Sequence, residues 1–178
     1  MTGVYTLDLS SGFLGWLGLN EATDREDGSF RINPVVGVLS DEIERLVVEL
    51  SAQEANEYYP PTISRNIGYV MPQHSYYSQV FGVEDHVEHD VMELASAVRV
   101  FGLPFMNSNS TVEALCESME RRLGLLDHIS YALPVGYMLL GKPERAREWI
   151  AHRLEVLEQT PSPATDRYRD FAQRFPGR

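Results

Sequence analysis

Histidine and carboxylate side chains, which bind metal ions and transfer protons, are concentrated between positions 84 and 90. The segment reads EDHVEHD, so His86 and His89 are three positions apart and each has an acidic residue four positions away. Residues at these spacings share a face of a helix, and imidazole and carboxylate groups on one face are suitable ligands for a divalent metal ion. The spacing matches neither two-histidine motif of the zinc enzymes, so a further ligand, His74 or His128, is needed. A metal-dependent or acid–base enzyme that uses His86, His89 and His74 is therefore one alternative.

The same acidic residues also suit the start of a solvent-exposed helix, without any metal. A helix macrodipole favours negative charge at its N-terminus, and five of the ten residues from 84 to 93 are acidic. A solvated acidic face attracts a basic surface on another protein, which speeds association and selects the partner. Our main interpretation is therefore partner binding, and we expect no cofactor. The expected partner-binding residues are Glu84, Asp85, Glu88, Asp90, Glu93, Tyr76 and Tyr77.

Tyrosine pairs supply the second part of this expected surface. The chain has nine tyrosines, and four of them form the pairs Tyr58–Tyr59 and Tyr76–Tyr77. Adjacent residues of a strand point to opposite faces of the sheet, so one member of each pair is expected to be exposed. Because tyrosine adds contact area with little loss of conformational entropy, the second pair beside the acidic helix is typical of a protein-binding surface.

Residues 136–142, GYMLLGK, resemble a phosphate-binding loop but lack its chemistry. That loop needs flexible residues between its glycines and a serine or threonine hydroxyl for the magnesium ion. Here the intervening residues are bulky and apolar, and Pro143 stands in place of the hydroxyl. We expect Gly141 to end one helix and Pro143 to begin the next. The sequence also has neither G-x-S-x-G nor G-x-G-x-x-G, the motifs of serine hydrolases and of dinucleotide-binding proteins.

Cys116 is the only cysteine, so a disulfide scaffold or a cysteine-rich zinc module is excluded. A nucleophilic thiol needs a positive setting and a base within reach. Glu113, Glu117 and Glu120 stand close to Cys116 in the sequence and would raise the pKa of its thiol. We therefore expect Cys116 to be a packed or half-buried residue of a helix.

Length and charge set the class of protein. The chain has 178 residues, 43% of them hydrophobic, and a formal net charge of −11, which is typical of an acidic globular protein with a sizeable core. The acidic excess argues against nonspecific nucleic-acid binding and against docking on an anionic membrane. The first ten residues have no basic region, and the apolar stretch 129–141 is too short to span a bilayer. We expect a cytoplasmic protein with neither a nucleic-acid nor a membrane partner.

The negative charge is concentrated in the first half of the chain. Residues 1–98 carry a net charge of −12, whereas residues 99–178 carry +1. The expected partner is therefore a protein with a basic surface, which the first half would bind. The identity of this partner and the oligomeric state do not follow from the sequence.

The elements that would position these residues are strands first and helices afterwards. Residues 3–39 alternate apolar stretches with turn residues, which predicts strands, and two further strands are expected at 62–71 and 75–81. This order favours an α+β fold with an N-terminal, mainly antiparallel sheet of about 4–5 strands and two packed helices, followed by a C-terminal helical region.

Two helices are expected among the strands. The first covers 41–50 and begins with Asp41 as its cap, and the second covers 84–101 and ends at Gly102 and Pro104. Apolar residues at helical spacing predict the side of the second helix that faces the core. This expected buried stripe comprises Val87, Val91, Leu94, Ala95, Val98 and Phe101.

The second half of the chain is expected to be helical. Ser110 and Glu113 form a capping box for one helix, and further helices are expected near 127–140, 143–158 and 164–175. Within this region one set of residues has the spacing of a repeat motif: Tyr137, Gly141, Ala146, Ile150 and Leu154.

This spacing resembles a single tetratricopeptide-type helical hairpin over residues 127–158. The resemblance departs from the family pattern at Pro134 and Arg153, where small residues are usual, and no second copy is visible. It implies helix–helix packing and a protein-binding surface, without catalytic chemistry. We expect a strand-rich part at 1–104 and a helical part at 105–178 that share one core as a single domain.

The absence of catalytic motifs, the acidic first half and the tyrosine pairs together favour a non-enzymatic protein-binding module. Its concrete form is an acidic inhibitor or immunity-type protein that covers a basic site on a toxin or nuclease. The metal-dependent or acid–base enzyme is the first alternative. The second is a structural subunit of a larger assembly, in which the apolar helix at 129–140 would be buried against a partner.

Overall fold

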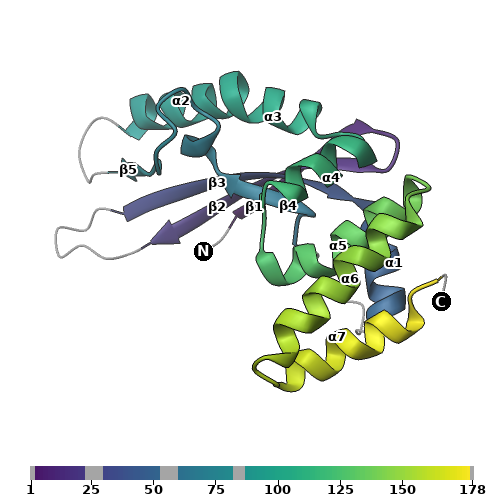
Figure 1. Ribbon diagram of the computed structural model, residues 1–178. Coiled ribbons are helices and arrows are strands. Elements are labelled where there is room, and N and C mark those ends of the chain that lie inside the picture. The colour runs from purple at the N-terminus through teal and green to yellow at the C-terminus, as the bar shows by residue number, and fades with distance from the viewer. Residues whose placement is uncertain (1–2, 23–29, 53–59, 82–86, 177–178) are drawn as a thin grey trace. The chain divides into compact units, whose positions relative to one another are not determined.

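The computed structural model describes residues 3–22, 30–52, 60–81 and 87–176 (Figure 1). Within them the chain is α+β, as the sequence predicts, with an antiparallel sheet followed by helices. The strands are β1 (Gly3–Ser10), β2 (Phe13–Ala22), β3 (Phe30–Ser40), β4 (Ile63–Asn66) and β5 (Gln79–Phe81). The α-helices are α1 (Asp41–Ser51), α2 (Val87–Ala97), α3 (Leu103–Ser108), α4 (Val112–Glu120), α5 (Leu126–Leu139), α6 (Pro143–Glu158) and α7 (Pro163–Arg174). The two other helical segments are the 3₁₀ helix η1 (Ile67–Tyr69) and the π-helical η2 (Val98–Gly102).

The chain forms two compact units, and neither is continuous in the sequence. Unit 1 comprises residues 1–39 and 64–110, and unit 2 comprises residues 40–63 and 111–178. The segment 40–63 belongs to the helical unit because α1 packs against α5 and α7. The sequence pattern places this segment among the strands, since packing between distant helices leaves no local signal.

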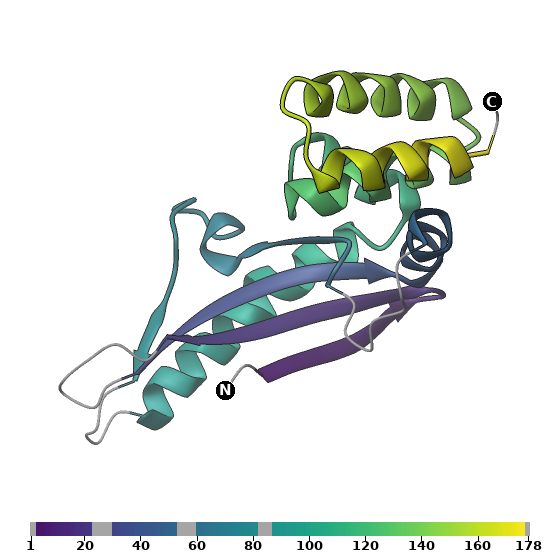
Figure 2. The same ribbon diagram turned by 90° about the horizontal axis from the view of Figure 1, so that it is seen from below.

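Unit 1 is an antiparallel sheet with a long helical segment across one face (Figures 1 and 2). The strand order is β1-β2-β3-β4, and β5 pairs with β3 so that Phe30 stands opposite Phe81. The rings of these two residues stack with their centroids 5.0 Å apart. The helical segment approaches the sheet closely at Gly102, where an added Cβ would lie 3.1 Å from Val36.

The long helical segment of unit 1 ends later than the sequence predicts. The helical path continues from α2 through η2 into α3 and ends at Ser108. The prediction that Gly102 and Pro104 end the helix is therefore wrong. Gly102 serves the close approach to β3, and Pro104, which has no N–H to donate, lies directly after the π turn at the start of α3. The wider π turn of η2 connects the two helices.

The two strands expected at 62–71 and 75–81 are shorter than predicted. β4 ends at Asn66, whose side-chain oxygen accepts a hydrogen bond from the backbone N–H of Gly68 at 3.0 Å. This bond starts η1 and removes the backbone from the strand ladder, as asparagine side chains often do. The residues before Gln79 likewise do not pair as a strand.

Unit 2 is a set of helices built around α5. α5 is buried along most of its length, and α1, α4 and α6 pack against it, while α7 packs against α1 and α6. Each of the five helices contributes a fully buried apolar side chain, namely Ile43, Leu115, Leu133, Ala146 and Phe171. α5 and α6, which carry the tetratricopeptide resemblance, pack against each other, and membership of that family stays a prediction. The helix that the structural-subunit alternative would bury against a partner is buried inside its own unit.

Two helices of unit 2 are capped one residue away from the predicted position. Ser40 rather than Asp41 caps α1, and its hydroxyl accepts a hydrogen bond from the backbone N–H of Ile43 at 3.4 Å. Asp41 lies in the first turn, where its charge suits the helix dipole. Thr111 rather than Ser110 caps α4 through the N–H of Ala114 at 3.2 Å.

Other local predictions for unit 2 are confirmed. Gly141 follows α5 with a φ of 66°, and Pro143 is the first residue of α6. Cys116 is buried, and this burial, together with Glu120, raises the pKa of its thiol to about 12. Such a thiol is inert rather than nucleophilic at neutral pH. None of the helices in the described ranges is long and apolar enough to cross a bilayer.

Candidate functional site

A chain of hydrogen bonds joins two of the expected partner-binding residues, Tyr77 and Asp90. The Tyr77 hydroxyl donates to Oε1 of Gln79 at 2.5 Å, and the Gln79 amide donates to Oδ1 of Asp90 at 3.1 Å. This chain fastens α2 to β5 and to the residues that precede it. Glu84 and Asp85, which belong to the same expected surface, lie outside the described residues.

Asn66 fixes the backbone of Tyr77. Its Nδ2 donates to the carbonyl oxygen of Tyr77 at 2.8 Å, and its Oδ1 accepts from the Tyr77 N–H at 2.9 Å. Burial raises the pKa of the Tyr77 phenol, and the carboxylates of Glu93 and Asp90 raise it further. The phenol therefore stays a hydrogen-bond donor at neutral pH, and it interacts electrostatically with both carboxylates.

The other described residues of the expected surface face solvent. Glu88 and Glu93 are exposed, and Tyr76 exposes 57% of its surface. Glu93 Oε1 lies 3.5 Å from Nε2 of His89, one turn earlier on α2. Ion pairs between exposed side chains contribute little to stability. Glu88 and Glu93 are therefore available to a partner.

α2 turns part of its apolar stripe to solvent. Leu94 and Ala97 are buried, but Val87, Val91 and Ala95, which the sequence pattern assigns to the core, are exposed. This part of the prediction is wrong because α2 is buried along the line of Leu94 and Ala97. The three exposed residues lie further round the helix, at spacings of four. Periodicity alone does not distinguish two neighbouring lines on one helix.

A second exposed line runs beside these residues on α2. Glu88 and Met92 are four positions apart, and Met92 is 64% exposed, while Val91 next to it is 49% exposed. Apolar patches that are rimmed by charged residues mark interaction surfaces. We name the exposed residues Val87, Glu88, Val91, Met92 and Ala95 the α2 face, and Glu93 is exposed further round the helix, beside His89.

Two of the three histidines of the alternative metal site lie in the described residues. His74 is exposed in the turn before β5, where its φ is 46°, and His89 is on α2 beside Glu93. His86 is outside the described ranges. The part of the chain that the structure describes contains no group of three or more metal-ligating side chains. The metal site stays a prediction.

Unit 2 contains a buried polar cluster that the sequence reasoning missed. Glu44 of α1 is 4% exposed, and its Oε1 accepts a hydrogen bond from the Thr62 hydroxyl at 2.6 Å and lies 3.0 Å from Nε2 of His128. A buried carboxylate requires partners of this kind. One signal was present in the sequence, because Glu44 lies between Ile43 and Val47 on the inner side of α1.

Comparison with known proteins gives no relative for this chain. No protein-family model, no curated protein and no solved structure matches it. A function must therefore be argued from the residues and their geometry.

Proposed function

We propose that unit 1 is a non-enzymatic protein-binding module that uses the α2 face to bind a partner with a basic surface. The observation that carries this proposal is the exposure of Val91 and Met92 in the middle of an acidic helix. Single exposed apolar residues are common on proteins, but here several share one helix side. Apolar contacts that exclude water would supply affinity, and the carboxylates around them would select a cationic partner.

The charge of unit 1 supports the same kind of partner. Glu88 is exposed on the α2 face and Glu93 is exposed beside it, and unit 1 carries a net charge of −6. A field of one sign steers an oppositely charged partner towards the surface and raises the association rate. An inhibitor or immunity-type protein that covers a basic site on a toxin or nuclease is the concrete form of the proposal. We place this module in the cytoplasm, with no nucleic-acid partner.

The α2 face is held in position before a partner arrives. The hydrogen bonds from Tyr77 through Gln79 to Asp90 join α2 to the residues around β5. On the inner side of α2, the Leu94 side chain is buried. A rigid surface loses less conformational entropy on binding than a mobile one, which favours a specific and stable complex.

Substitutions on and beside the α2 face should separate its apolar and its charged contributions. Replacing Val91 and Met92 together by serine keeps the charge, and we expect about tenfold weaker binding through faster dissociation.

Replacing Glu88 and Glu93 by lysine should slow association about tenfold at low salt and weaken its salt dependence. The partner is the stoichiometric basic protein that the full chain captures from native lysate at low salt. Surface plasmon resonance with this partner at two ionic strengths measures the association and dissociation rates.

Matched controls are available on α6. Val156 is an exposed valine and Glu155 an exposed glutamate. Val156→Ser and Glu155→Lys each make one substitution of the same kind away from the α2 face and should leave both rates unchanged. Capture of no basic protein, or equal loss of binding in the α6 controls, would count against the proposal.

A further inference from the structure

Unit 2 contains a cavity of about 180 Å³ where α5, α6 and α7 meet. Tyr131 of α5, Arg153 of α6 and Arg167 of α7 line it, together with Asp127 of α5, whose side chain is almost fully exposed. Two guanidinium groups and a phenol thus share one small cavity.

Several hydrogen-bond donors of this cavity have no acceptor among the described residues. The Arg167 guanidinium and the Tyr131 hydroxyl make no hydrogen bond with any residue in the described ranges. Arg153 has one partner there, Asp127, at 3.4 Å between Nη2 and Oδ1, and the Asp127 side chain is almost fully exposed. A long and solvated ion pair of this kind is weak, and the buried Nε of Arg153 is left without a partner among the described residues.

Both cations are near the phenol. Burial raises the pKa of Tyr131, the positive charge of Arg167 lowers it, the Asp127 carboxylate raises it, and Arg153 lowers it to a smaller extent. The two guanidinium groups and the Asp127 carboxylate are therefore all close to this hydroxyl.

Aromatic packing holds Tyr131 in place. Its ring makes edge contacts with Tyr168 and Phe171 of α7, at centroid distances of 5.1 and 5.0 Å. Tyr168 is fully buried, and its hydroxyl donates to the carbonyl oxygen of Ser130 at 3.0 Å. α7 is thus fixed against α5, and with it the side of the cavity that carries Arg167.

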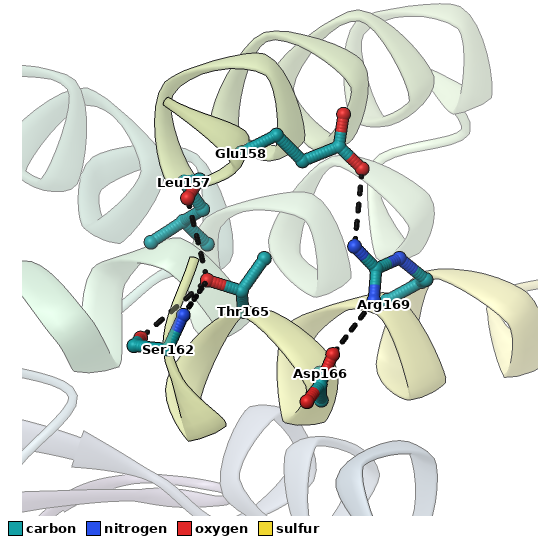
Figure 3. A network of polar contacts seen from close by, with 6 residues as sticks. All are labelled: Leu157, Glu158, Ser162, Thr165, Asp166 and Arg169. Atoms are coloured by element: carbon teal, nitrogen blue, oxygen red, sulfur yellow. Dashed lines mark hydrogen bonds and ion pairs between the residues drawn. The ribbon is translucent and has the colours of Figure 1, made fainter. Parts of the chain in front are cut away.

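A network of polar contacts holds the turn between α6 and α7 (Figure 3). The Thr165 hydroxyl donates to the carbonyl oxygen of Leu157 at 3.3 Å and accepts from the N–H of Ser162 at 3.1 Å. Arg169 bridges the two helices by binding Glu158 at 3.3 Å, while it also binds Asp166 at 2.7 Å. Arg153 and Arg167 are therefore held on facing helices whose turn is fixed.

We propose that this cavity is an oxyanion-binding site, which takes the phosphate or carboxylate group of a small molecule. Arg153 and Arg167 would donate charge-assisted hydrogen bonds to the oxygens, in the fork geometry that guanidinium groups offer to both kinds of anion. The Tyr131 hydroxyl would donate a third bond. The site lies in unit 2 and does not depend on the α2 face.

Calorimetry on the full chain tests the site directly. We expect one saturable site when sodium phosphate or sodium malonate is titrated at constant ionic strength in chloride buffer. Arg153→Gln and Arg167→Gln should each weaken binding about tenfold or more, and Tyr131→Phe about threefold, because bonds to charged groups are the stronger ones. The anion with the lower Kd shows whether the natural group is a phosphate or a carboxylate.

Arg174→Gln is the matched control, since Arg174 is exposed near the end of α7 and does not line the cavity. This variant should bind the anion as the wild type does. Arg167 is exposed and Tyr131→Phe keeps the ring, so both variants should fold, which circular dichroism checks. Absence of saturable binding of both anions to the wild type, or an equal loss in Arg174→Gln, overturns the site.

Discussion

Replacement of Gly68 by alanine is expected to destabilise unit 1 by about 3 kcal/mol or more, because overpacking against backbone cannot be relieved by a rotamer change. An added Cβ would lie 2.0 Å from the carbonyl oxygen of Ser75 and 2.6 Å from the backbone nitrogen of Tyr77. The segments that Asn66 joins would have to separate, and its hydrogen bonds to Tyr77 would be lost. Urea denaturation followed by circular dichroism measures the change in the free energy of unfolding.

Gly12→Ala is the control for this prediction. Gly12 has a φ of 81° and no atom within 4 Å of an added Cβ, so the substitution introduces backbone strain without a clash. That strain amounts to roughly 1 kcal/mol. Equal destabilisation by the two substitutions would show that the contact of Gly68 with the segment 75–77 is not what requires a glycine.

Gly68 also shows where sequence reasoning about unit 1 succeeds and where it fails. The apolar residues after Thr62 have strand propensity, and β4 does form in the expected place. The strand ends early because Asn66 bonds to Gly68 and to the backbone of Tyr77. The partner of the second bond is eleven residues away, and no single-sequence pattern indicates which backbone an asparagine side chain will bind.

The sequence predicted the exposed acidic residues of α2, but it did not predict that apolar residues of α2 are exposed. Glu88 and Glu93 are exposed, as an acidic helix start predicts. The apolar spacing assigned Val91 to the core. Such spacing shows that a helix has an apolar side, but it does not show which part of that side is buried. Which line of that side is buried depends on how α2 packs in unit 1, and this is decided by tertiary contacts such as those of Leu94.

The oxyanion cavity had no sequence signal at all. Tyr131, Arg153 and Arg167 come from three helices, and their spacing in the chain matches no motif. Helix ends, in contrast, were predictable at Gly141 and Pro143 because they depend on the backbone of the residue itself. Local backbone chemistry is readable from one sequence, whereas a site assembled by packing is not.

The second large effect is expected at Gly136, the first glycine of the segment that resembles a phosphate-binding loop. An added Cβ would lie 2.5 Å from Sγ of Cys116, and its next neighbours, Met119 and Ile43, are at ordinary contact distance. The buried thiol has one torsion with which to move away. Gly136→Ala should therefore destabilise the protein by about 2 kcal/mol, although alanine favours the helix by about 1 kcal/mol over glycine.

Replacing Cys116 by alanine should reverse the sign of the stability change that Gly136→Ala causes. In a Cys116→Ala background the clash is absent, and Gly136→Ala fills the vacated space and adds helix propensity, so that it should stabilise by about 1 kcal/mol. Thermal or urea denaturation of the two single variants and the double variant gives a coupling energy, expected near 3 kcal/mol. Additive effects would show that Gly136 is not required by the close approach of α4 to α5. A coupling of this size would show that Gly136 is required by its packing against Cys116.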